Sequence, residues 1–206
     1  EIESFSRIVP TGTVGTGPAS FTVTTKNGLI YDYGLSSDAQ ILAGTSGTIR
    51  TWALSRIRDR VGNKISFSYT NDTANGTYRI AKITYPTAAT GAGPYYEVVF
   101  AYVARPTSDV PSGYLNGFAV KEPNELATIT IQNYGATTPI KTYNFAYEQG
   151  TATNRLRLSA IKECSATNCF PATTIAYQNG QAGWVTAATS LSQTSASPTR
   201  ILPIDL

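Results

Sequence analysis

The sequence predicts an all-β protein built from stacked antiparallel hairpins, arranged either as a curved sheet or as a β-sandwich-like body. Apolar residues at helical spacing are almost absent from the chain. Runs of alternating apolar and polar residues, bounded by Gly, Pro and Asn, recur along most of its length. Several of these runs also share one residue pattern, which indicates a repeated hairpin unit.

The first predicted hairpin joins residues 21–25 to residues 29–33. Both runs alternate in polarity, and Asn27 and Gly28 lie between them. Asn-Gly between two such runs is a strong hairpin signal, because both residues tolerate positive φ. Asn27 and Gly28 are therefore expected to be structural turn residues.

A second hairpin is predicted between residues 52–58 and residues 65–69. Asp59, Gly62 and Asn63 lie in the connection. The Asp59 side chain can accept hydrogen bonds from the turn backbone, and Gly62 can adopt the left-handed conformation of a bulge. We expect these three residues to build a tight turn.

Three further units follow the same plan. They pair residues 80–85 with 95–102, 126–131 with 140–147, and 158–162 with 173–177. From the second hairpin onward, the first strand carries Leu or Ile, two spacers and Ile, and the second ends in an apolar residue, one spacer and Tyr. The second-strand positions are Phe67, Tyr69, Phe100, Tyr102, Phe145, Tyr147, Ile175 and Tyr177.

Residues two apart on a strand share one face, so these positions predict an aromatic ladder along the sheet. Coincidence is the alternative explanation, because all β proteins are rich in Tyr, Ile and Thr. Residues 105–124 interrupt the pattern with three prolines and two glycines and are expected to form a long loop or an insertion. We expect a hairpin-repeat domain over residues 1–183 and a connector into a following repeat domain over residues 184–206.

Composition argues against several classes of function. The chain has no His, which removes the usual general base and the commonest transition-metal ligand. No pair of acidic residues forms a recognisable hydrolase motif, and solvent exposure is the ordinary expectation for Glu97 and Glu148. We therefore expect no enzyme, no metal and no cofactor.

The formal net charge of +3 comes from scattered basic residues rather than a dense stripe, so nucleic-acid binding is not expected. Arg56, Arg58 and Arg60 are expected to form a solvated strand face. No run of apolar residues is long enough for a membrane span, and we expect no membrane insertion by this segment.

Cys164 and Cys169 flank a predicted hairpin turn. Facing residues across two strands are close enough for a disulfide, which would be usual in a secreted protein. Two reduced, mostly buried thiols are the alternative. Their spacing does not match a Cys-x-x-Cys redox motif.

An ordered series of segments resembles the N-terminal SpvB-type region found in B-type subunits of bacterial insecticidal toxin complexes and in RHS (YD-repeat) proteins. The segments are residues 27–34, 52–63, 147–149, 163–164 and 177–180. The resemblance covers residues 5–184. It implies an RHS/YD-like curved sheet that contributes to a hollow shell around a toxic C-terminal polypeptide.

The expected function is accordingly that of a non-catalytic structural module of a secreted or cell-surface bacterial virulence protein. The resemblance implies as partners the remainder of the parent chain, the toxic C-terminal polypeptide and a pore-forming toxin-complex subunit. The alternative is a surface binding module, an adhesin that recognises a glycan or a host protein. The number of Tyr residues, 13, and the loop over residues 105–124 support that alternative.

Overall fold

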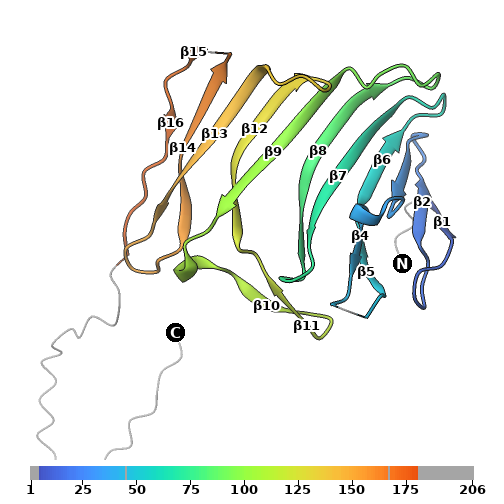
Figure 1. Cartoon of the computed structure of the whole chain (residues 1–206), viewed down its shortest axis with the longest axis horizontal. Coiled ribbons are helices and arrows are strands. Elements are labelled where there is room, and N and C mark those ends of the chain that lie inside the picture. The colour runs from blue at the N-terminus through green and yellow to red at the C-terminus, as the bar shows by residue number, and fades with distance from the viewer. Residues whose placement is uncertain (1–4, 45, 167, 181–206) are drawn as a thin grey trace, which may run out of the picture.

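One large antiparallel sheet dominates the computed structural model, which describes residues 5–44, 46–166 and 168–180 (Figure 1). Its twelve strands are β1 (Arg7–Thr11), β2 (Ser20–Thr24), β3 (Ile30–Tyr33), β6 (Leu54–Arg58), β7 (Lys64–Asp72), β8 (Thr77–Thr87), β9 (Tyr96–Ala104), β12 (Asn124–Asn133), β13 (Pro139–Gln149), β14 (Leu156–Ser165), β15 (Asn168–Cys169) and β16 (Thr173–Thr174). Neighbours follow chain order from β1 to β15, and β16 also pairs with β14.

The predicted hairpins lie edge to edge within this sheet. Each hairpin also pairs with the next, as β7 does with β8 and β9 with β12. The other sheets of the described chain are two-stranded: β4 (Gln40–Leu42) with β5 (Ile49–Trp52), and β10 (Ser112–Leu115) with β11 (Phe118–Lys121). The all-β prediction is confirmed, and its form is the open curved sheet rather than the sandwich.

The two faces of the sheet differ in chemistry, because side chains of cross-strand partners share a face. The apolar face carries two rows of half-buried side chains, which are Phe67, Ile83, Val98 and Ile131, then Phe100, Ile129 and Tyr143. The polar face carries a row formed by Thr22, Asp32, Arg56, Ser66, Thr84, Glu97 and Gln132.

A β-bulge recurs at one level of the sheet. The pairing shifts by one residue between β3 and β6, β7 and β8, β9 and β12, and β13 and β14. In each case the extra residue is small, and the residues are Ser55, Ala81, Ala127 and Ser159. A bulge bends its strand and increases the local twist, so an aligned row of bulges accounts for the curvature visible in Figure 1.

A tyrosine hydroxyl bridges the two strands of each repeating hairpin beside its bulge. Backbone pairing within these hairpins stops before the Leu or Ile that precedes the extra residue. The hydroxyls donate to the carbonyl oxygens of those residues: Tyr69 to Leu54 (2.8 Å), Tyr102 to Ile80 (2.9 Å), Tyr147 to Leu126 (2.8 Å) and Tyr177 to Leu158 (2.8 Å). The two halves of the repeated pattern are thus joined by a hydrogen bond.

Two segments differ from the predicted arms and loops. Trp52 ends β5 instead of beginning β6, and its indole Nε1 donates to the Pro18 carbonyl at 3.0 Å while its ring packs edge-on against Phe21. Residues 105–124 form an insertion rather than a long loop, because they contain the 3-10 helix η2 (Thr107–Asp109) and the β10–β11 hairpin. Asn116 and Gly117, both at positive φ, form its two-residue turn.

A small buried core lies beside the large sheet. Ala39, Ile41 and Ala53 are buried together, and Tyr69 and Tyr78 pack against them. Ala39 belongs to the short 3-10 helix η1 (Ser37–Ala39), which precedes β4. This core fixes η1 and the β4–β5 hairpin against the β7–β8 pair.

We predict that Tyr102→Phe lowers the free energy of unfolding by about 1–2 kcal/mol, because the Ile80 carbonyl loses its donor while the ring is retained. Urea denaturation followed by circular dichroism measures the change. Tyr134→Phe is the matched control, since that side chain is 53% exposed, and its effect should stay within about 0.5 kcal/mol. Equal effects of the two substitutions would contradict a structural role for the bridging hydroxyl.

Candidate functional site

A buried carboxylate joins three strands on the polar face. Asp32 is 1% exposed and accepts hydrogen bonds from Arg56 Nε at 2.6 Å, Arg58 Nε at 3.0 Å and Thr22 Oγ1 at 2.8 Å. Burial opposes ionisation of Asp32, but these hydrogen bonds outweigh it and lower its pKa below the ordinary value. Arg56 and Arg58 are therefore counter-ions of Asp32, and the expectation of a merely solvated face is wrong for them.

Glu97 forms a similar cluster further along the polar face. It is 2% exposed, so its expected solvent exposure is wrong. Its Oε2 lies 2.8 Å from Lys82 Nζ, and its Oε1 accepts a hydrogen bond from Gln132 Nε2 at 2.7 Å. Burial again opposes ionisation, but these partners lower the pKa of Glu97. The cluster ties β8, β9 and β12 together.

A third buried carboxylate, Asp109, lies in the segment that precedes the β10–β11 hairpin and joins it to β14. Its carboxylate lies 2.9 Å from Arg105 Nη1 and 3.2 Å from Arg155 Nη1, and it accepts the backbone N–H of Leu156 at 3.0 Å. The backbone hydrogen bond from Leu156 and the two arginines lower the pKa of Asp109 despite its burial. Asp109 thus attaches η2 to the start of β14.

The predicted turn residues of the first two hairpins lie side by side at one end of the sheet. Asn27 Oδ1 accepts the Leu29 N–H at 3.1 Å, and Asp59 Oδ1 accepts the N–H of Gly62 at 2.7 Å and of Asn63 at 2.9 Å. The two turns together line one shallow depression. At Gly28, where φ is +86°, a Cβ would lie 2.1 Å from Arg60 Nε, so a larger residue would strain the backbone and displace the Arg60 side chain.

The aromatic positions form a row that alternates with aliphatic residues. Tyr69 faces Ile80, Tyr102 faces Leu126, and Tyr147 faces Leu158. Ring contacts in the described residues join other pairs, namely Phe21 with Trp52, Tyr69 with Tyr78, and Tyr85 with Tyr96. Tyr33, which faces Leu54, is a further member. The pattern of residues 31–33 could have identified Tyr33 from the sequence, although the predicted ladder begins at Phe67.

Cys164 and Cys169 are disulfide-bonded. They are directly opposite each other in the β14–β15 pair. Asn144 Nδ2 lies 3.7 Å from Cys164 Sγ on the side of β13. The disulfide therefore attaches the two-residue strand β15 to the end of the sheet.

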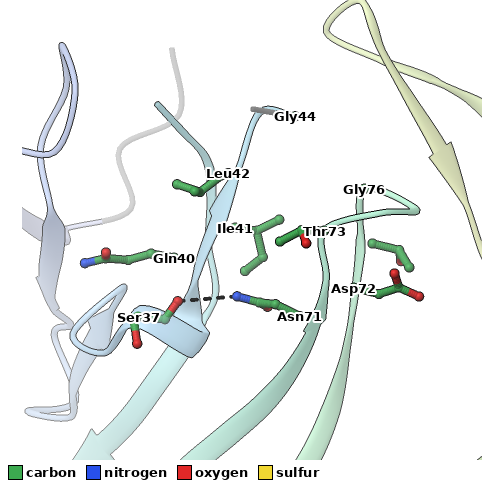
Figure 2. A pocket seen from close by; sticks show the side chains of 10 residues that line it. Ser37, Gln40, Ile41, Leu42, Gly44, Asn71, Asp72, Thr73 and Gly76 are labelled. Carbon is green, nitrogen blue, oxygen red and sulfur yellow. Dashed lines mark hydrogen bonds between the residues drawn. The ribbon is translucent and has the colours of Figure 1, made fainter. Parts of the chain in front are cut away.

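A cavity of about 90 Å³ lies between η1, the β4–β5 hairpin and the β7–β8 turn (Figure 2). Its wall includes Ile41, Leu42 and Asn71, and Asn71 Nδ2 donates to the Ser37 carbonyl at 3.3 Å. The β10–β11 hairpin is tied to the same turn, since Lys121 N–H donates to the Asn75 carbonyl at 2.8 Å. The cavity was not predicted from the sequence. The β10–β11 hairpin was not predicted either, although its Asn116-Gly117 turn is a sequence signal for it.

The described residues offer no evident metal or membrane-spanning element. No group of three or more Cys, Asp or Glu side chains in them could hold a metal ion. None of their helices is long and apolar enough to span a membrane. The expected connector over residues 184–206 lies outside the described residues.

No model of a protein family matches the sequence, and no curated protein sequence matches it. Solved structures share its fold. The N-terminal domain of effector protein SpvB from Salmonella typhimurium strain LT2 has a TM-score of 0.62 and 16% identity, over 80% of this chain and 66% of that one. The corresponding values for the TcdB2-TccC3-TEV structure are 0.67 and 15%, over 86% and 11%.

The Photorhabdus luminescens Tc holotoxin pore has a TM-score of 0.63 and 14% identity, over 85% of this chain and 11% of that one. The chain thus spans less than two thirds of the SpvB chain and about a ninth of the toxin chains. The predicted resemblance to the SpvB-type region is confirmed at the level of the fold.

We predict that Asp32→Asn destabilises the chain by about 2–3 kcal/mol near neutral pH, because Arg56 and Arg58 lose their shared counter-ion. The pKa of Asp32 is lower in the folded state, so its contribution is present above the ordinary value of 3.8 and is lost as the pH falls below it. Urea denaturation from pH 7 to pH 3 should show the wild type approaching the variant. Glu148→Gln, at an exposed ion pair, should change stability by less than about 1 kcal/mol.

The Tyr69 hydroxyl yields a prediction for alkaline pH. Burial raises the pKa of Tyr69 to about 12, from an ordinary value of 10.0. A raised folded pKa means that stability is complete below pH 10 and is lost as the pH rises toward 12. Tyr69→Phe should therefore cost stability at pH 8 and lose part of that penalty at pH 11.5. A penalty that does not change with pH would contradict the burial of this hydroxyl.

Proposed function

We propose that the chain is a non-catalytic structural module of a bacterial toxin-complex or RHS-type protein. It contributes a wall segment to a β shell that encloses a toxic C-terminal polypeptide. The observation that carries this proposal is the single-layer sheet, whose apolar face is covered in the described residues only near Tyr69 and Tyr78, by η1 and the β4–β5 hairpin. A shell segment can turn such a face inward, away from solvent.

The comparisons support this proposal. The shared fold occurs in the TcdB2-TccC3-TEV structure and in a Tc holotoxin pore, where it corresponds to 11% of the matched chain. A sheet that is one part of a large assembly can leave its edges and one face to neighbouring segments. The partners in this proposal are the remainder of the parent chain, the enclosed polypeptide and a pore-forming subunit of a secreted toxin.

The buried acidic groups support a structural role over a catalytic one. Asp32 and Glu97 are each paired with cationic side chains, and the pKa of each is lowered. A general acid at neutral pH requires the opposite shift. The adhesin alternative has weaker support, because the solved structures that share the fold are an effector protein and toxin-complex proteins.

Protease protection in the full-length protein that contains this chain tests the proposal. We expect the C-terminal polypeptide to resist trypsin in that protein and to be cleaved rapidly as an isolated fragment. Ile131→Lys, on the apolar face, should reduce this protection several-fold. Thr130→Lys is the matched control, because the adjacent residue lies on the polar face and should leave protection unchanged.

Circular dichroism of both variants should match that of the wild type, which controls for loss of the sheet. Cleavage of the C-terminal polypeptide at the rate of the isolated fragment in the wild-type protein would refute enclosure. Specific binding of the chain to a glycan array, with an unprotected C-terminal polypeptide, would favour the adhesin. Turnover by the homogeneous chain in hydrolase or transferase assays would refute the non-catalytic assignment.

A further inference from the structure

The last described segment, residues 168–180, is here called the strap. It lies along the outer edge of β14, with β15 paired at Cys164–Ser165 and β16 paired at Ala160–Ile161. Further along, the Ile175 N–H donates to the Ser159 carbonyl at 2.8 Å, and the Tyr177 hydroxyl bonds to Leu158. The strap therefore covers the backbone edge that β14 would otherwise expose.

Few contacts other than the disulfide hold the first part of the strap. Asn168, Cys169 and Phe170 are exposed, and Phe170 is 62% exposed despite its apolar ring. The backbone bonds here are those of the short β14–β15 pair and one from Phe170 N–H to the Glu163 carbonyl at 2.9 Å. A two-residue strand with no buried side chain is marginal without a covalent link.

The two sulfurs of the disulfide lie in different environments. Cys164 is 9% exposed and lies inside β14, whereas Cys169 is exposed on the strap. Asn144 Nδ2 is 3.7 Å from Cys164 Sγ, within reach of an N–H···S hydrogen bond. A nucleophile from solvent therefore reaches Cys169 Sγ first, and the amide of Asn144 can stabilise negative charge on Cys164 Sγ.

We infer that this disulfide is a reducible clasp for the strap, attacked by small thiol reductants at Cys169 with Cys164 as the leaving group. The thiolate forms a bond to Cys169 Sγ, the disulfide breaks, and the electron pair leaves on Cys164 Sγ. A second thiolate attacks the reductant sulfur of the mixed disulfide and releases Cys169. Two thiols thus supply two electrons and two protons, and they leave as the oxidised disulfide.

The clasp makes the edge of β14 dependent on the redox environment. Reduction frees residues 168–170 and exposes the β14 backbone at Cys164 and Ser165. The second part of the strap stays attached, because β16 and Tyr177 do not depend on the disulfide. This inference does not rest on the proposed shell function.

Glutathione trapping tests the direction of attack. The oxidised chain is treated briefly with glutathione, quenched with N-ethylmaleimide and mapped by peptide mass spectrometry. We expect glutathione on Cys169 and maleimide on Cys164. Glutathione mainly on Cys164, or no reaction until the chain is unfolded by denaturant, would overturn the inference.

Hydrogen exchange tests the release of the strap. Reduction should accelerate exchange of the Phe170 amide several-fold and change that of Ile175 much less. The Cys164→Ser, Cys169→Ser double variant should show the fast Phe170 exchange without reductant. Unchanged exchange at Phe170 in both experiments would refute the clasp.

The positioning role of Asn144 has its own control. Asn144→Ala should slow the glutathione reaction several-fold while leaving the unfolding midpoint of the reduced chain close to that of the reduced wild type. Asn133→Ala, at an exposed position on β12, should leave the rate unchanged. Equal rates for all three proteins would remove Asn144 from the proposal.

Discussion

The hydrogen bond from a tyrosine hydroxyl to the carbonyl of a Leu or Ile is the interaction on which the rest of the sheet depends. It lies where the first strand of each hairpin bulges in its pairing with the preceding hairpin, and where backbone pairing within the hairpin has stopped. Without it, a carbonyl in a partly apolar setting would lack a donor, which costs more than the bond itself contributes. Tyr69, Tyr102 and Tyr147 therefore make repeated bending compatible with a continuous sheet.

Buried ion pairs provide a second constraint, on the opposite face. Asp32 and Glu97 each bond to side chains from two other strands, so they fix the order and register of neighbouring strands more than they add net stability. The two kinds of interaction lie on opposite faces of the sheet. On the apolar side, tyrosine bridges satisfy carbonyls beside the bulges that curve the sheet, and on the polar side, carboxylate clusters set the register.

Much of this arrangement could be predicted from local sequence. The Asn27-Gly28 and Asp59-Gly62 turns are held by hydrogen bonds between residues close in the sequence, so they can be predicted locally. Alternation of apolar and polar residues identifies the strands. The burial of Asp32 and Glu97 could not be predicted, because it depends on partners more than 20 residues away in the chain. The cavity beside Asn71 likewise arises where three separate segments meet. The β10–β11 hairpin is different, because Asn116-Gly117 predicts its turn locally while the prolines on either side favour a loop.

The tyrosine row also has a direction. Every repeating hairpin begins with a carbonyl acceptor and ends with a hydroxyl donor, and each of Tyr69, Tyr102 and Tyr147 faces the aliphatic residue that begins the next hairpin. In-frame duplication or deletion of one whole hairpin would therefore preserve the pairing of tyrosine with Leu or Ile at each junction. Length can change in steps of one unit while this pairing is kept, which gives evolution a simple way to lengthen or shorten such a sheet.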